Sequence, residues 1–235
     1  MHVAQAPLRS PRGDPAQATL SAFLQTLQQG LGDWLPTAFD DTHDSLERVA
    51  QATASAADRA RLATLRATLR LQRPVWLPAL AQAIGRTIDE EFHGLGELPR
   101  AAAAREQSLS LLDEDTIDED IALSRLTQVA ELEADAALRE LAARCSNLRG
   151  LPSVRPDAHP MRPAVVARGL RQALAGFGLD GAQRLDLLRH LSAAIGNQLA
   201  PVYARQVAVL TEWGVQPMRF GMRDLAEGGA DAGAD

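Results

Sequence analysis

The sequence predicts an all-α protein, an irregular bundle of about six to eight helices without a sheet. Apolar residues recur at three- and four-residue spacing over most of the chain, which is typical of amphipathic helices. Proline, aspartate and glycine stand where helices commonly begin and end. No segment alternates apolar and polar residues between turn signals over the length of a strand.

The first helix is expected to follow a disordered arm. Residues 1–13 combine Pro, Arg, Gly and Ser with little apolar content. Asp14 and Pro15 then form a helix start, with Asp as the N-cap and Pro in the first helical position. An apolar stripe follows, and we expect Gly30 and Gly32 to end this helix.

Two further helices are expected before residue 95. The second begins at Asp41-Thr42 and ends at Arg73, because a residue before proline is pushed out of the α region. The third then runs from Pro74 to Gly94.

Proline and aspartate also divide the second half of the chain. A long acidic helix is expected to end near Gly150, before a proline-rich linker at 151–163. Pro163 starts another helix, and Asp180 caps the last long one. Pro201 should kink or split that last helix.

These expectations divide the chain into parts. The helical N-terminal part spans 14–150 and contains an acidic box at 106–140. The linker at 151–163 joins it to a C-terminal helical part at 164–222, which we expect to pack on the first. The small, acidic residues at 223–235 predict a disordered tail.

Composition excludes several functions. All 24 cationic residues are arginine, against 30 acids, for a net charge of −6. Without lysine, neither Schiff-base chemistry nor a lysine-containing phosphate loop is possible. The acidic balance argues against general nucleic-acid binding, and no uncharged run approaches the ~20 residues of a membrane span. A single cysteine, Cys145, and the lack of a secretory signal predict a cytoplasmic protein, with Cys145 in the core.

The acidic box carries the whole negative balance. Its eleven acids and two arginines sum to −9, whereas the rest of the chain sums to +3. One interpretation is a charged helix start, because Thr116 and Glu119 have the spacing of a capping box. A calcium loop is disfavoured, because its required glycine and its terminal glutamate are replaced by Asp118 and Ser124.

A third interpretation is a docking surface for arginines, in this chain or in another. The candidate residues are Asp113, Glu114, Asp115, Asp118, Glu119 and Asp120. The apolar residues of this helix fall on two sides, with Ile117 and Ile121 opposite Leu123 and Leu126. We therefore expect the helix to be sandwiched at the centre of the bundle.

Other constellations give weaker signals. Glu90 and His93 form one Glu-x-x-His step, whereas a helical di-iron site needs two such steps. The arginine-rich helix at 59–73 is expected to be a solvent face or a partner of the acidic box, with anion binding as the alternative. Ser-His-Asp catalysis stays open, since triads are spatial. Core positions are predicted for Trp34, Trp76 and Trp213.

Three stretches resemble a known family. They are LSLLDEDTIDEDIALSRL at 109–126, HPMRPAVVARGLRQAL at 159–174 and LAPVYARQVAVLTEWGVQP at 199–217. Their order is similar to that of a bacterial family known as domain of unknown function sixteen-thirty-one, over about 106–222. The resemblance implies a mostly helical cytoplasmic protein and an N-terminal region, a fragment or a short paralogue of longer members. It carries over no catalytic residue. Some relatives bear a thymidine phosphorylase label, which this lysine-free chain does not support.

Our leading hypothesis is a non-enzymatic helical interaction module that binds a protein partner or other modules of the same family. We predict no catalytic residue, no cofactor and no metal ligand. The alternative is an enzyme or small-ligand sensor with an inter-helical pocket lined by Arg, His and Asp. A deep pocket with Arg and either His93 or His190 would favour the alternative, whereas an exposed apolar groove would favour the module.

Overall fold

The computed structural model describes residues 15–94 and 114–218. Its helices are α1 (Pro15–Ala52), α2 (Ala56–Gly94), α3 (Glu114–Glu133), α4 (Asp135–Leu148), the short 3-10 helix η1 (Pro156–Ala158), α5 (Pro163–Ala175) and α6 (Gly181–Glu212). These described residues include six α-helices and no strand, so the all-α prediction is confirmed. The arm expected at 1–13 and the tail expected at 223–235 lie outside the described residues.

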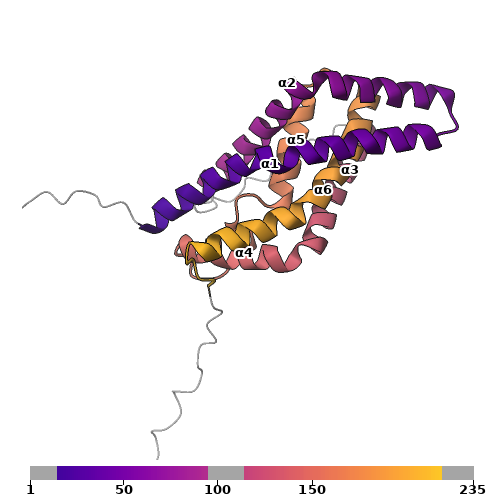
Figure 1. Ribbon diagram of the computed structural model, residues 1–235. Helices are drawn as coiled ribbons and strands as arrows, with labels where there is room; N and C mark the ends of the chain where they lie inside the picture. Colours follow the sequence, from indigo (N-terminus) through magenta and orange to yellow (C-terminus); the bar gives the residue numbers. More distant parts are fainter. Residues whose placement is uncertain (1–14, 95–113, 219–235) are drawn as a thin grey trace, which may run out of the picture.

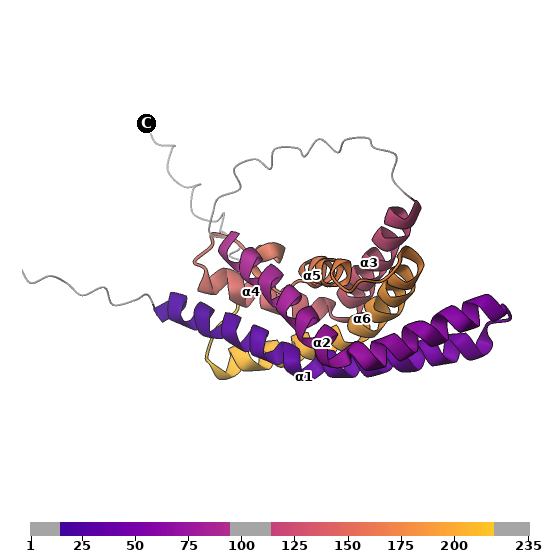
Figure 2. The same cartoon turned by 90° about the horizontal axis from the view of Figure 1, so that it is seen from above.

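The two longest helices organise the bundle. Helices α1 and α2 form an antiparallel hairpin, and α6 packs along α1 (Figures 1 and 2). Helix α3 lies beside α6, while α5 sits between α2 and the α3–α6 pair. Helix α4 packs against α6 and η1. Helix α6 therefore has α1 on one side and α3 on another.

Helix α1 is longer than predicted. It continues through Gly30 and Gly32, where an end was expected, and through Asp41, where a new helix was expected. Its buried stripe runs unbroken from Leu20 to Leu46. A glycine inside a helix costs only about 1 kcal/mol relative to alanine, so the burial of this stripe outweighs both glycines.

The prediction of a helix break at Arg73-Pro74 is also wrong. Helix α2 contains both Pro74 and Pro78 and continues to Gly94. Figure 2 shows it turning away from α1 near its middle, as expected for a proline bend. Trp76 is buried beside these prolines, so core packing holds the two halves as one helix.

Other sequence signals act as expected. Pro163 begins α5, and the Asp180 carboxylate accepts a hydrogen bond from the backbone N–H of Gln183 at 2.8 Å, capping α6. Pro201 lies inside α6 without splitting it.

Trp213 is 42% exposed and is not the predicted core anchor, because it follows the last residue of α6.

Helices α2 and α5 approach each other closely at Gly169. A Cβ atom there would lie 2.7 Å from the Ile84 Cα atom, which only glycine avoids. Beside it, the buried Thr87 hydroxyl lies 2.8 Å from the carbonyl of Ile84 and 3.3 Å from that of Val165. This crossing fixes α5, and with it the preceding segment that carries His159 into the core.

Candidate functional site

Helix α3 lies at the edge of the bundle, so the prediction that it is sandwiched at the centre is wrong. Leu123 and Leu126 are buried, because this side of α3 packs on α5 and α6. Ile117 and Ile121 point the other way, and each is 45% exposed. The second apolar side that the sequence indicates is real, but no described residue buries it.

This outer side forms an apolar surface that we call the α3 ridge. It consists of Ile117, Ile121, Val129 and Leu132. Leu132 is 82% exposed, which is unusual for a leucine in a well-packed bundle. Beside Val129 lies a hollow of about 230 Å³ between α3 and α6, with Gly196 in its wall.

Three acids of the predicted docking surface pair with arginines of the same chain. Asp118 contacts Arg189 at 2.6 Å and Glu119 contacts Arg184 at 2.7 Å, both on α6. Asp120 pairs with Arg171 of α5. We call these three pairs the arginine seam; they join the start of α3 to its neighbours.

The remaining residues of that predicted surface are only partly described. Glu114 and Asp115 lie in the first turn of α3. Asp113 lies outside the described residues.

The arginine-rich part of α2 has other partners. Arg61 pairs with Asp58 and with Asp186 of α6. Arg66 contacts Glu47 at 3.1 Å, and Arg73 pairs with Asp40, both on α1. Arg66 and Arg73 therefore tie the hairpin together and Arg61 joins α2 to α6, whereas the ion pairs of these three arginines include no described acid of the box.

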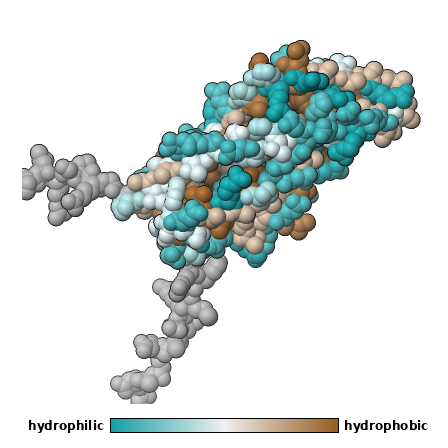
Figure 3. Space-filling model, viewed as in Figure 1, coloured by the Kyte–Doolittle hydropathy of each residue, from teal (hydrophilic) through white to brown (hydrophobic). Residues whose placement is uncertain are grey.

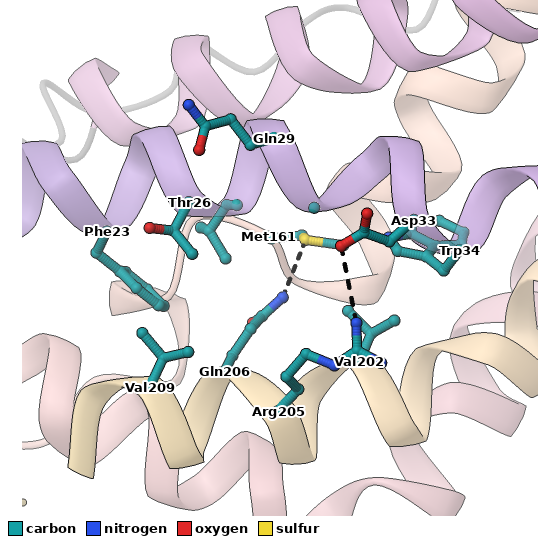
Figure 4. A pocket seen from close by; sticks show the side chains of 12 residues that line it. Phe23, Thr26, Gln29, Asp33, Trp34, Met161, Val202, Arg205, Gln206 and Val209 are labelled. Atoms are coloured by element: carbon teal, nitrogen blue, oxygen red, sulfur yellow. Dashed lines mark hydrogen bonds and ion pairs between the residues drawn. The ribbon is translucent and has the colours of Figure 1, made fainter. Parts of the chain in front are cut away.

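A pocket opens between α1 and α6, on the opposite side of α6 from the ridge. Its volume is about 260 Å³. Its walls are mainly apolar, formed by Phe23, Leu27, Trp34, Met161, Val202 and Val209 (Figure 4). Figure 3 shows the surrounding face as largely hydrophilic, with hydrophobic atoms in small patches. The pocket is therefore an apolar recess in a polar surface.

Polar groups stand at the mouth and in the wall of this pocket. Asp33 of α1 and Arg205 of α6 form an ion pair at 3.8 Å, and both side chains are 68% exposed. Only 7% of Gln206 is exposed. Its amide Nε2 donates a single hydrogen bond, to the Met161 sulfur at 3.3 Å (Figure 4). Its Oε1 has no hydrogen-bond partner.

Two more unpartnered polar side chains lie close to Gln206. The His159 ring packs between Phe23, at 6.1 Å between ring centroids, and Tyr203, at 5.8 Å. Neither ring nitrogen of His159 nor the Tyr203 hydroxyl meets a partner with full hydrogen-bond geometry. Burial lowers the pKa of His159 to about 3, and the nearby Gln206 amide acts against burial by interacting with the ring, so the imidazole is neutral. Burial also raises the pKa of Tyr203.

The histidines named as markers of an enzyme or sensor do not line this pocket. His93 is exposed and lies 3.6 Å from Asp89. His190 shares a hydrogen bond of 2.9 Å with Ser45, but Asp186, one turn before it, bonds to Arg61 instead of the imidazole. The Ser-His-Asp arrangement therefore lacks its orienting carboxylate.

Two further expectations concern reactive groups. Cys145 is fully buried, as predicted, and burial raises the pKa of its thiol to about 12, which keeps it protonated. Within residues 15–94 and 114–218, no three His, Cys, Asp or Glu side chains gather as a metal site would require.

The family model for the N-terminal domain of DUF1631, a protein of unknown function, matches residues 15–214. The chain belongs to this family. The match encloses all six described α-helices and both regions beside α6. Neither the curated proteins nor the solved structures contain a match to the chain. In the part of this DUF1631 domain that the structure describes, every helix is too short or too polar to cross a bilayer.

Sequence reasoning missed the polar residues of the pocket. In the DUF1631 domain, Tyr203 and Gln206 occupy the buried face of α6 that continues to Leu210. A glutamine at such a position is a detectable signal, because an amide in an apolar stripe needs hydrogen-bond partners. The pairing of Asp33 with Arg205 had no such signal, because 172 positions separate residues 33 and 205.

Proposed function

We propose that this DUF1631 N-terminal domain is a helical protein-interaction module whose α3 ridge binds a basic amphipathic helix of a partner protein. The observation that carries the proposal is the ridge itself, four apolar side chains along the side of α3 that faces away from the core. Within each of the pairs Ile117–Ile121 and Val129–Leu132 the spacing is that of helix-to-helix docking, in which anchors recur every three or four residues. The exposed Arg125 lies between the two pairs.

The charge of α3 supports a basic partner. Between residues 114 and 133 the sequence has seven acids and one arginine, and three of these acids pair with arginines of α5 and α6. Glu131 and Glu133 are exposed on either side of Leu132, the most exposed residue of the ridge. Arginine or lysine side chains flanking an apolar stripe would meet these carboxylates as the apolar residues dock.

The arginine seam has a supporting part in this proposal. It holds α3 at a fixed rotation against α5 and α6, so that Leu123 and Leu126 face inward and the ridge faces outward. The hollow beside Val129 offers room for one apolar side chain of the partner. We take the cytoplasm as the setting, because the buried Cys145 is kept as a thiol.

A defined peptide tests the proposal. A fluorescent 20-residue helical peptide with leucine at every third or fourth position and arginine elsewhere is compared, by anisotropy, with a scrambled peptide of the same composition. We expect Leu132→Asp to weaken binding of the amphipathic peptide by at least about tenfold, as loss of a central apolar contact does.

The matched control is Leu71→Asp on α2, because Leu71 is 76% exposed and lies outside the ridge. This variant should bind the amphipathic peptide as the unmodified protein does. Equal binding of the scrambled peptide would show that binding depends on charge alone and would refute the proposal. Equal loss in both variants would show that the α3 ridge is not the binding site and would refute it too.

A second function is favoured by one specific observation. The α1–α6 pocket combines apolar walls with the amide of Gln206, whose Nε2 has only the Met161 sulfur as acceptor. Such a combination is typical of small-ligand sites, so the same domain would also bind a small molecule.

A further inference from the structure

We infer that the α1–α6 pocket binds a free aromatic α-amino acid, with its side chain against Gln206 and its charged head between Asp33 and Arg205. The inference rests on this pocket and is independent of peptide binding at the α3 ridge. Tyrosine is the amino acid whose groups fit the described residues best.

The size and walls of the pocket select a small, flat, apolar group. Its volume of about 260 Å³ falls just below the roughly 300–1,000 Å³ typical of drug-sized ligands. Phe23 and Trp34 project into it from α1, and Val202 and Val209 face them from α6 (Figure 4). An aromatic ring would fill this space and exchange water contacts for ring contacts.

The Gln206 amide supplies a hydrogen-bond donor to the wall of the pocket. Its Oε1 is turned to the His159 side and is inaccessible, whereas Nε2 has only the Met161 sulfur, a weak acceptor. A phenolic hydroxyl can accept a hydrogen bond from Nε2 in place of the sulfur. Phenylalanine has no such group and would leave the amide unsatisfied.

The mouth of the pocket matches a zwitterion. Asp33 can bind an ammonium group, and Arg205 can bind a carboxylate. Their own ion pair is a single exposed contact at 3.8 Å. Exchanging that contact for the two charges of an amino-acid head group therefore forfeits little.

The groups behind Gln206 restrict which side chains can enter. His159 and Tyr203 are fully buried there, and burial keeps both uncharged near neutral pH. A cationic side-chain tip would meet the positive charges of Arg149 and Arg162 at this depth. The pocket should therefore reject arginine.

Isothermal titration calorimetry on the full chain tests this inference with four ligands. L-tyrosine is compared with L-phenylalanine, which lacks the hydroxyl, with tyramine, which lacks the carboxylate, and with 3-(4-hydroxyphenyl)propionate, which lacks the ammonium group. We expect phenylalanine to bind at least about tenfold more weakly than tyrosine, as for loss of one buried hydrogen bond. Tyramine and the propionate should bind about two- to fivefold more weakly, because the charges that they lack meet exposed partners.

Two glycine variants on α1 form a matched pair. Gly30 lines the pocket, Gly32 does not, and a Cβ at either position would meet no atom within 4 Å. Gly30→Leu should fill the pocket and abolish tyrosine binding, whereas Gly32→Leu should leave it unchanged. Both variants should keep the helical circular dichroism spectrum, since leucine favours helix over glycine.

Arg205→Gln separates pocket filling from head-group recognition. It should weaken tyrosine binding without weakening tyramine binding, because tyramine has no carboxylate and its ammonium group binds Asp33. The inference is overturned if tyrosine does not bind at millimolar concentration, which would mean that water alone fills the pocket. It is also overturned if the Gly30 and Gly32 variants bind tyrosine equally.

Discussion

The arginine seam and the α1–α6 pocket lie on different sides of α6 and treat polar groups in opposite ways. In the seam, carboxylates and guanidinium groups meet directly at a partly wet surface. In and behind the pocket, Gln206, His159 and Tyr203 are buried and keep polar atoms without partners. Paired surface charges mainly fix geometry, whereas unpartnered buried groups oppose folding.

The contrast between the arginine seam and the α1–α6 pocket indicates which residues of the molecule are candidates for binding a ligand. The acidic residues draw attention in the sequence because there are many of them, yet Asp118, Glu119 and Asp120 are occupied by arginines of the same chain. In the wall of the pocket and behind it, Gln206 and His159 cost stability as they stand. An unfavourable buried group that persists in a fold is a stronger indication of a ligand than a satisfied surface charge.

The largest expected effect concerns the two sides of α3. Leu126 is 1% exposed, so Leu126→Ala should lower the free energy of unfolding by about 2–5 kcal/mol. Ile121 is 45% exposed, and Ile121→Ala should cost less than about 1 kcal/mol. Urea denaturation of both variants measures the difference. Similar losses for both would mean that the ridge is covered, for example by self-association.

The buried histidine predicts a pH dependence. The pKa of His159 falls from 6.5 in an exposed chain to about 3 in the fold. Below about pH 6.5 the unfolded chain therefore takes up a proton that the native protein does not bind, and the free energy of unfolding should fall by up to about 1.4 kcal/mol per pH unit. Above about pH 6.5 the His159 ring is neutral in both the folded and the unfolded chain, so its protonation no longer lowers the free energy of unfolding.

Denaturation curves between about pH 7.5 and pH 5 check this slope, a range in which ordinary carboxylates stay ionised. His159→Phe should flatten the curve, because it removes the titrating group. The pKa of His190 is also lowered, mainly by burial. A smaller pH slope of the same sign should therefore remain in His159→Phe. An unchanged slope in His159→Phe would show that His159 already has a partner in the native protein.

The Tyr203 hydroxyl allows a finer test of the same buried groups. Because it has no partner, Tyr203→Phe should leave the free energy of unfolding unchanged or raise it by about 1 kcal/mol. Thermal denaturation without added ligand is sufficient to measure this. A clear loss of stability would reveal a hydrogen bond to ordered water and would weaken the contrast between pocket and seam.

The smallest effect is expected in the arginine seam. The Asp118–Arg189 pair is about half exposed, so a double-mutant cycle with Asp118→Ala and Arg189→Ala should give a coupling of about 0–1 kcal/mol. Raising the salt concentration should reduce it further. A coupling of several kcal/mol that resists salt would contradict the description of the seam as a wet surface contact.

Local sequence signals succeeded where one residue decides the backbone. Pro163 and Asp180 begin α5 and α6 as predicted, because a missing N–H or a capping carboxylate acts within one turn. They failed at Gly30 and Pro74, where the helices continue. A local preference of about 1–3 kcal/mol was outweighed there by burial of apolar side chains on both sides of the break.

The sequence by itself determined the all-α class, several helix starts and the two apolar sides of α3, because these depend on spacing and on backbone chemistry within a few residues. Only the tertiary structure decided which side of α3 is buried, which arginines meet the acids, and that Gln206 lies in a pocket between α1 and α6. These features depend on contacts between residues far apart in the chain, and helical periodicity gives the direction of a side chain without identifying the helix that it meets.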